Sequence, residues 1–134
     1  LRFMLVNEFI SQVEKDNIIS TLLKYYKVGN IRIRYKMMND YAHYDVDRGI
    51  LDLSSKYKSI KSRQMKDFLI TILHEIRHAM DAKKYGWKKF KHMYEMEMNY
   101  QIANDKHQYK DNKYEIEAEE FGQKNWKQWY NKFK

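Results

Sequence analysis

The sequence lacks cysteine and proline entirely, and only four of its 134 residues are glycine. Without cysteine there are no disulfides, thiolate ligands or cysteine nucleophiles, so any metal must be held by histidine and carboxylate groups. The same absence fits a reducing compartment, and we take a cytoplasmic protein as the default expectation. With no proline and so few glycines, nothing indicates a flexible linker. We therefore predict one domain spanning residues 1–134.

Long hydrophobic runs are also missing. No apolar stretch approaches the roughly 20 residues that a helix needs to cross a bilayer. The opening letters, LRFMLV, form too short an apolar region for a signal peptide. We therefore expect no association with a membrane.

Positive charge and aromatic residues are abundant. The formal net charge is +8, and lysines gather in residues 83–91 and 124–134. Such stretches either form a solvated surface or attract an anionic partner such as nucleic acid, and both interpretations stay open. Twelve tyrosines, six phenylalanines and three tryptophans indicate a globular core rather than a disordered chain.

The first half of the chain is predicted to form one helix and a small sheet. Apolar residues from about residue 7 to residue 26 recur at helical spacing; they are Phe9, Ile10, Val13, Ile18, Leu22 and Tyr25. Residues 31–36, IRIRYK, alternate strictly between apolar and basic, as in a half-buried strand. Two more strands are predicted at about 42–46 and 49–53, joined by a turn. The sheet is then small, of about three strands, and mostly antiparallel.

The second half is predicted to be helical, with helices at about residues 63–84, 87–105 and 113–132 and a polar loop at 106–112. The apolar face of the middle helix is predicted to comprise Trp87, Phe90, Tyr94, Met98 and Ile102. A helix, a small sheet and then three helices make an α+β fold.

The letters HEIRH at residues 74–78 lie well inside the first of these three helices. Its apolar stripe is centred on the opposite side from His74 and His78. Imidazoles four residues apart are neighbours on a helix and can chelate one Zn²⁺ ion. Glu75 lies on the adjoining turn, where a carboxylate can accept a proton from metal-activated water. The alternative is an amphipathic helix whose polar face carries two histidines without a metal.

A catalytic zinc site usually needs a third protein ligand. Glu115 lies within the apolar stripe of the last helix, where a carboxylate is costly unless something pairs with it. We predict Glu115 as the third ligand, with Glu117 as the alternative carboxylate. Glu119 lies one turn further and is expected to accept a hydrogen bond from a ligand histidine. His92 and His107 are weaker candidates.

This arrangement resembles that of the gluzincin zinc metallopeptidases, which combine HExxH with a glutamate ligand on a later helix. The order of elements is similar to that of their minimal members, among them small phage and bacterial domains of the ImmA/IrrE type. In these domains the ligand glutamate stands three residues before an alanine, with an aromatic residue three further on, and Glu115, Ala118 and Phe121 match. Lys84 excludes the related class whose third ligand is a histidine six residues after the second.

Residues 85–93, YGWKKFKHM, are also similar to part of the SprT-type metallopeptidases. Gly86, Phe90 and Lys91 match the SprT pattern, but Tyr85 stands where those proteins carry their third ligand, a histidine. This departure favours Glu115 as the third ligand.

The sequence thus predicts a zinc-dependent hydrolase, a metallopeptidase that acts on a peptide or protein substrate with Glu75 as general base. The alternatives are a DNA-associated metalloprotease or nucleic-acid-binding protein, and a protein whose zinc is purely structural. A strand edge beside the site is expected to bind an extended peptide. The candidates for stabilising the transition-state oxyanion are Tyr85, Tyr100, Tyr109, Tyr114 and His43.

Overall fold

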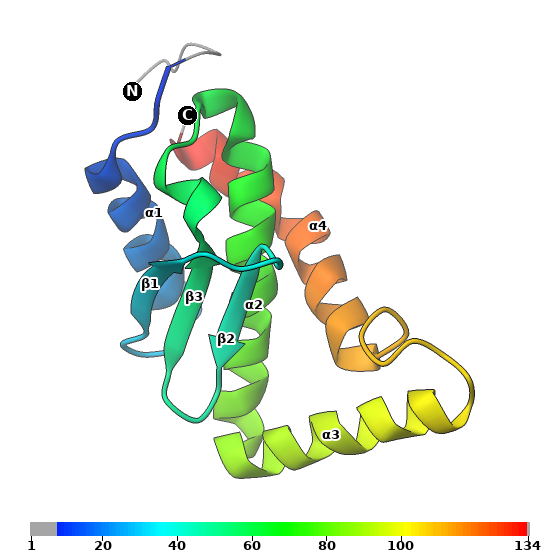
Figure 1. Cartoon of the computed structure of the whole chain (residues 1–134). Coiled ribbons are helices and arrows are strands. Elements are labelled where there is room, and N and C mark those ends of the chain that lie inside the picture. The colour runs from blue at the N-terminus through cyan, green and yellow to red at the C-terminus, as the bar shows by residue number, and fades with distance from the viewer. Residues whose placement is uncertain (1–7, 134) are drawn as a thin grey trace.

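The computed structural model describes residues 8–133 and shows an α+β fold, as predicted (Figure 1). Its elements are α1 (Gln12–Tyr25), β1 (Arg32–Lys36), β2 (Ala42–Asp45), β3 (Ile50–Ser54), the 3₁₀ turns η1 (Ser55–Lys58) and η2 (Ser62–Gln64), α2 (Met65–Tyr85), α3 (Trp87–Ala103) and α4 (Lys113–Phe133). None of the described helices has the length and apolar character of a membrane span.

The first helix begins later than predicted. Ser11 is its N-cap, and the Ser11 hydroxyl accepts a hydrogen bond from the backbone N–H of Glu14. Phe9 and Ile10 precede the helix and instead align with the segment before η2, where Ile10 N–H donates to the carbonyl of Ile60 at 2.9 Å. The predicted start at residue 7 lies outside the described residues.

The buried face of α1 also differs from the predicted one. Val13 is 78% exposed, and Tyr25 is exposed as well, because Ile18, Ile19 and Leu22 determine which side of the helix meets the core. Lys15 is fully buried on that side. Its ammonium group donates hydrogen bonds to the carbonyls of Tyr57 and Lys58 in η1.

The sheet has the strand order β1–β3–β2 and is mixed. The predicted hairpin of β2 and β3 is antiparallel, whereas β1 joins β3 in parallel. The predicted alternation of β1 holds, since Ile33 and Tyr35 pack on the core while Arg34 binds Asp52 of β3 at 2.8 Å. In Figure 1 the sheet lies in front of α1 and α2, so the central strand β3 is enclosed by its neighbours and is buried throughout.

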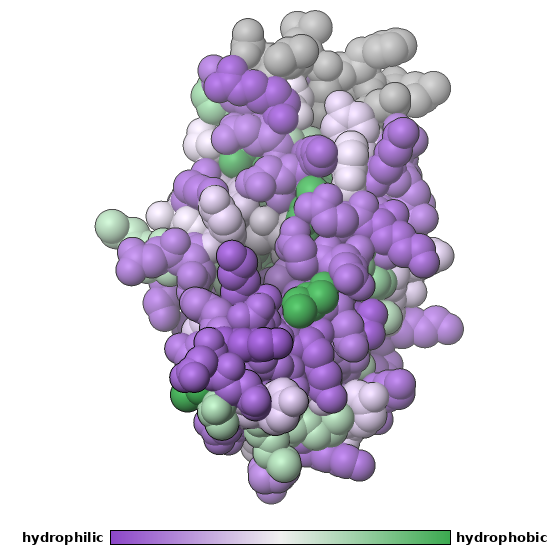
Figure 2. Space-filling model, turned by 90° about the vertical axis from the view of Figure 1, so that its right-hand side faces the viewer, coloured by the Kyte–Doolittle hydropathy of each residue, from purple (hydrophilic) through white to green (hydrophobic). Residues whose placement is uncertain are grey.

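The helices of the second half lie close to the predicted ranges, but α3 is less buried than its pattern indicated. Phe90 is 2% exposed, whereas Trp87 and Ile102 are 42% and 52% exposed. The reason is that α3 turns away from the end of α2 and extends from the body of the molecule (Figure 1). The face on the side of α4 and the loop before it is dominated by hydrophilic residues, with isolated hydrophobic ones (Figure 2).

Close packing of α4 against α2 depends on Gly122. A Cβ atom at this position would meet the backbone carbonyl oxygen of Ile70 in α2 at 3.0 Å and its Cγ2 atom at 3.2 Å. Both contacts are tight, and the nearer atom belongs to the helix backbone, which does not yield easily. Gly122 therefore sets the separation of the two helices that carry the candidate site.

We predict that Gly122→Ala destabilises the protein. Alanine gains about 0.5–1 kcal/mol in helix propensity, but the overpacking against Ile70 costs about 1–3 kcal/mol. Thermal and urea unfolding should show a net loss of about 1 kcal/mol. Gln123→Ala, at the exposed neighbouring position, is the matched control and should stay within about 0.5 kcal/mol. A Gly122→Ala protein more stable than the wild type would contradict this account of the helix contact.

Candidate metal centre

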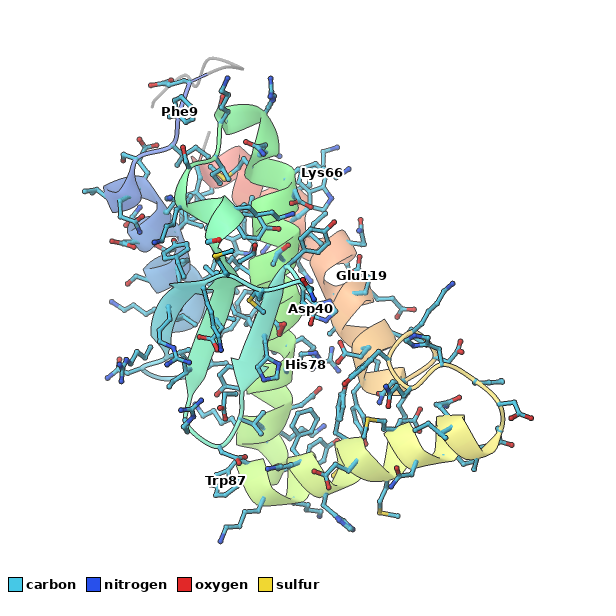
Figure 3. The ribbon with its side chains drawn as sticks, in the orientation of Figure 1. Phe9, Asp40, Lys66, His78, Trp87 and Glu119 are labelled. Atoms are coloured by element: carbon cyan, nitrogen blue, oxygen red, sulfur yellow. The ribbon has the colours of Figure 1, made fainter. Side chains whose placement is uncertain are left out.

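The centre of the site is one carboxylate oxygen shared by two imidazoles. His74 and His78 lie one turn apart on α2 and both face α4. The Nε2 atoms of His74 and His78 lie 2.8 and 3.0 Å from Oε1 of Glu115. The cluster thus forms between α2 and α4, on which Figure 3 labels His78 and Glu119.

The geometry of these three residues fits a zinc ion. One ligand atom from each lies within 4.8 Å of the others. Two ligands of a tetrahedral zinc ion, each about 2.0–2.1 Å from it, are about 3.4 Å apart. The two Nε2-to-oxygen distances, 2.8 and 3.0 Å, need to lengthen by about half an ångström to reach that value. Two histidines and a glutamate are also a donor set found at catalytic zinc sites.

The cluster is open on one side. The side chains of His74 and Glu115 are 22% and 24% exposed, whereas that of His78 is 10% exposed. Structural zinc sites are usually closed, with four protein ligands, whereas catalytic sites keep one position open. Three ligands with partial exposure therefore match the catalytic type.

The competing ligand candidates lie elsewhere. Glu117 turns toward Arg77, with its Oε2 atom 3.5 Å from Nη2 of that side chain. His92 is exposed on α3, and His107 accepts hydrogen bonds from the backbone N–H groups of Tyr109 and Lys110. None of the three candidates belongs to the cluster that the described residues form.

Glu119 reaches the second nitrogen of His74. Its Oε1 atom lies 3.2 Å from Nδ1 of His74, the relation that the sequence predicted. A carboxylate at Nδ1 fixes the orientation of the ring and leaves Nε2 directed at the metal position. Glu119 is therefore placed to orient a ligand rather than to bind the ion itself.

Tyr94 contacts the cluster, and the sequence did not predict this. Its hydroxyl donates a hydrogen bond to Oε2 of Glu115 at 2.5 Å, so both oxygens of this carboxylate are engaged. The sequence placed Tyr94 on an apolar helix face, where only its phenolic oxygen signalled a need for a polar partner. This contact ties α3 to the centre.

The tyrosines predicted as oxyanion stabilisers have other surroundings. Tyr100 and Tyr109 are more than half exposed, and Tyr114 packs its ring against Phe90 and Tyr94. Tyr85 packs at the edge of the same aromatic cluster. None of the four has a hydrogen bond to the ligand cluster within residues 8–133.

Glu75 is almost completely buried beside the cluster. It is 7% exposed, and its Oε2 atom has no hydrogen-bond partner among the described residues. Burial raises the pKa of this carboxyl group, while the charges of His78 and His74 act in the opposite direction. His43 on β2 is close enough for its charge to act on Glu75 as well. A buried carboxylate with one unpartnered oxygen atom thus lies close to the histidine cluster.

The electrostatics of the cluster favour positive charge. Burial alone would lower the pKa of His74, but the hydrogen bond to Glu115 and the charges of Glu75 and Glu115 outweigh it and raise the pKa to about 9. Burial acts to raise the pKa of Glu115, but the hydrogen bonds from His74 and His78 hold it far below its usual range. A dication at this position would replace protons as the positive charge that satisfies Glu115.

Comparison of the chain with models of known protein families, with curated proteins and with solved structures finds no match. The resemblance to gluzincins therefore rests on the residues of the site and on the order of the elements.

We predict that Glu115→Ala lowers zinc affinity at least about a hundredfold, because it removes one of three ligands. Glu117→Ala is the matched control on the same helix and should change zinc affinity less than about twofold. Elemental analysis of the purified proteins and competition with a chromogenic chelator would measure this. Loss of zinc from Glu117→Ala alone would show that the ligand is misassigned.

For Tyr94→Phe we expect zinc affinity to fall by about tenfold, because Glu115 loses the donor that orients its second oxygen. The same chelator competition would measure the change. Tyr100→Phe, which removes an exposed hydroxyl from the same helix, should leave the affinity unchanged. Equal affinities for wild type and Tyr94→Phe would show that this hydrogen bond does not support the centre.

Proposed function

We propose that this protein is a zinc-dependent hydrolase that cleaves peptide bonds. In this proposal His74, His78 and Glu115 hold the zinc ion and Glu75 is the general base. The observation that carries the proposal is the convergence of these three donors from α2 and α4 beside a buried carboxylate with a free oxygen atom.

The chemistry divides between the metal and the chain. Zinc bound at this position would act as a Lewis acid that activates a water molecule and polarises the scissile carbonyl. The Glu75 carboxylate takes the proton from the attacking water and passes it to the leaving amine. Burial raises the pKa of Glu75 toward the range that suits a general base, and a nearby dication acts in the opposite direction.

The surrounding residues hold the ligands in place. Glu119 binds Nδ1 of His74, and Tyr94 binds Oε2 of Glu115. Each contact leaves the opposite atom of the ligand free to face the metal position. These contacts matter because even a small displacement of a catalytic group strongly lowers the reaction rate.

The proposed substrate is a polypeptide in extended conformation. Among the described strands, β2 pairs on one side only, with β3, so its other edge is free to add a strand. Figure 1 shows β2 crossing in front of α2, and the charge of its His43 acts on Glu75. A peptide hydrogen-bonded to this edge would lie along the side of α2 that carries the proposed base.

The competing proposal is a zinc ion that only connects two helices. Two observations speak against it. First, α2 and α4 are already joined by close packing at Gly122 and by Trp129 in the main core. Second, a site that only held helices together would gain nothing from Glu75, and burying its Oε2 atom without a hydrogen-bond partner costs stability. A catalytic role for Glu75 would explain why the protein keeps this destabilising burial, because functional sites often break the rules that favour stability.

The test is Glu75→Gln, which keeps the shape of the side chain but cannot act as a base. We expect cleavage of fluorescein-labelled casein to fall by at least about a hundredfold while zinc content stays the same. Glu120→Gln, an exposed carboxylate of α4, is the control and should retain full activity. A wild-type protein that binds zinc and is as inactive as Glu75→Gln on casein and on a mixed peptide library would favour the structural site.

A further inference from the structure

We propose that two adjoining hollows on the side of α1 and α2 bind an acidic, amphipathic segment of another polypeptide. This proposal does not depend on the metal centre, because it concerns different side chains and a different readout.

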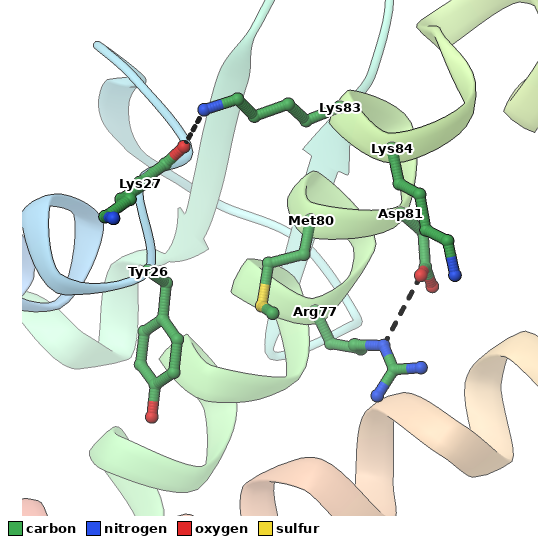
Figure 4. Close-up of a pocket in the computed structure, with 7 residues that line it drawn as sticks. All are labelled: Tyr26, Lys27, Arg77, Met80, Asp81, Lys83 and Lys84. Carbon is green, nitrogen blue, oxygen red and sulfur yellow. Dashed lines mark hydrogen bonds and ion pairs between the residues drawn. The ribbon is translucent and has the colours of Figure 1, made fainter.

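The two hollows lie where α1 ends and the last turns of α2 pass beside it. One, of about 620 Å³, lies between Tyr26 and the α2 side chains of Arg77 and Met80 (Figure 4). The other, of about 710 Å³, lies between α1 and β1. Lys27 and Lys83 line both. The hollows therefore adjoin, and each has the size of a site for a few side chains.

Lys27 and Lys83 form the boundary between the hollows. The Lys83 ammonium group donates a hydrogen bond to the carbonyl of Lys27, as Figure 4 shows. Lys27 has φ 56°, a left-handed conformation that is uncommon for residues other than glycine. The contact supports the end of α1, so Lys83 has a structural role and is left unchanged in the experiment.

The lining is strongly cationic. Five basic side chains contribute to it: Lys24, Lys27, Arg77, Lys83 and Lys84. Two carboxylates, Asp16 and Asp81, belong to the same lining, and Glu117 of α4 pairs with Arg77 from outside it. Asp81 lies 3.4 Å from Nε of Arg77, and Asp16 accepts a hydrogen bond from Gln12. An excess of cations at a concave surface attracts carboxylates or phosphates.

Two of these cations are available to a partner. The ion pairs formed within residues 8–133 leave Lys24 and Lys84 without a carboxylate. Both are exposed, one at the end of α1 and the other near the end of α2. Their ammonium groups can therefore bind an incoming anion without first giving up an internal one.

The apolar part of the lining favours a polypeptide over a nucleic acid. The second hollow is lined by Ile19, Leu23, Ile31 and Ile33, and the first by Met80. Proteins that bind single-stranded nucleic acids typically combine a cationic groove with free aromatic rings on which the bases stack. Tyr26, the one aromatic ring in the lining, is packed edge-on against Phe121 and Trp129. A segment that alternates carboxylates with aliphatic side chains matches both the charge and the apolar floor.

The experiment measures fluorescence anisotropy with three labelled probes: a short peptide of alternating Glu and Leu, the same peptide with Ser in place of Leu, and an oligothymidylate of similar length. We expect the Glu/Leu peptide to bind most tightly and the Glu/Ser peptide at least about fivefold more weakly, because it lacks the apolar contact. Equal affinity for the two peptides, or tighter binding of the oligothymidylate, would overturn the proposal.

A pair of charge-reversed proteins separates this site from general electrostatic attraction. Lys24→Glu with Lys84→Glu changes the hollows, and Lys88→Glu with Lys89→Glu changes exposed lysines of α3. Each substitution lowers the charge by two, so both proteins go from +8 to +4. We expect the first pair to weaken the Glu/Leu peptide by at least about tenfold and the second by less than about threefold.

Equal weakening by the two pairs would overturn the proposal, because it would show attraction to net charge alone. Circular dichroism checks that the variants fold. If a reversed protein does not fold, the corresponding Lys→Gln pairs replace both reversals, with the same ranking expected. Because the readout is binding, a loss of casein cleavage leaves this result unaffected, and the reverse also holds.

Discussion

The candidate centre depends on one partly buried carboxylate, that of Glu115. An ionised carboxylate between two helices is stable only if its oxygens are satisfied, and here two imidazoles and a phenol satisfy them. The three donors come from α2 and α3, while the acceptor belongs to α4. The same interaction therefore assembles the site and joins the three helices of the second half of the chain.

This interaction requires the helices to be close, and the core supplies that closeness. Apolar residues of α2 pack against the face of the sheet that is turned toward the helices, and Trp129 and Phe121 of α4 pack against the same core. The hydrogen bonds of the cluster lie along one side of this apolar contact. The hydrophobic effect therefore contributes most of the free energy that packs α4 against α2. The cluster can then be arranged for chemistry rather than for stability, as its partial exposure indicates.

Much of this arrangement could be predicted from sequence, because it follows from local periodicity. The helices of the second half, the alternation of β1 and the placing of His74 and His78 opposite an apolar stripe all depend on residues close in the chain. The position of Glu115 on an apolar face could also be predicted, since a misplaced carboxylate is a local signal. The parallel pairing of β1 with β3 could not, because it depends on a connection that passes through β2.

What escaped prediction depends on contacts between distant segments. Tyr94 has the same periodicity as a core residue, and only the approach of α4 gives its hydroxyl a partner. Lys15 is likewise polar by type but buried, because η1 offers backbone carbonyls at that place. Val13, which is apolar, is exposed because the buried face of α1 lies elsewhere.

The buried ammonium of Lys15 has a consequence for how the N-terminal helix docks. Its charge is met by carbonyl oxygens, and burial lowers its pKa. Contacts of apolar side chains such as Ile18 and Leu22 are non-directional and would tolerate a small shift or rotation of the helix. An ammonium group moved away from its two acceptors would instead be a buried charge without a partner, which is costly. Lys15 thus restricts α1 to a single position and rotation against the rest of the protein, the one in which its ammonium group reaches both carbonyls.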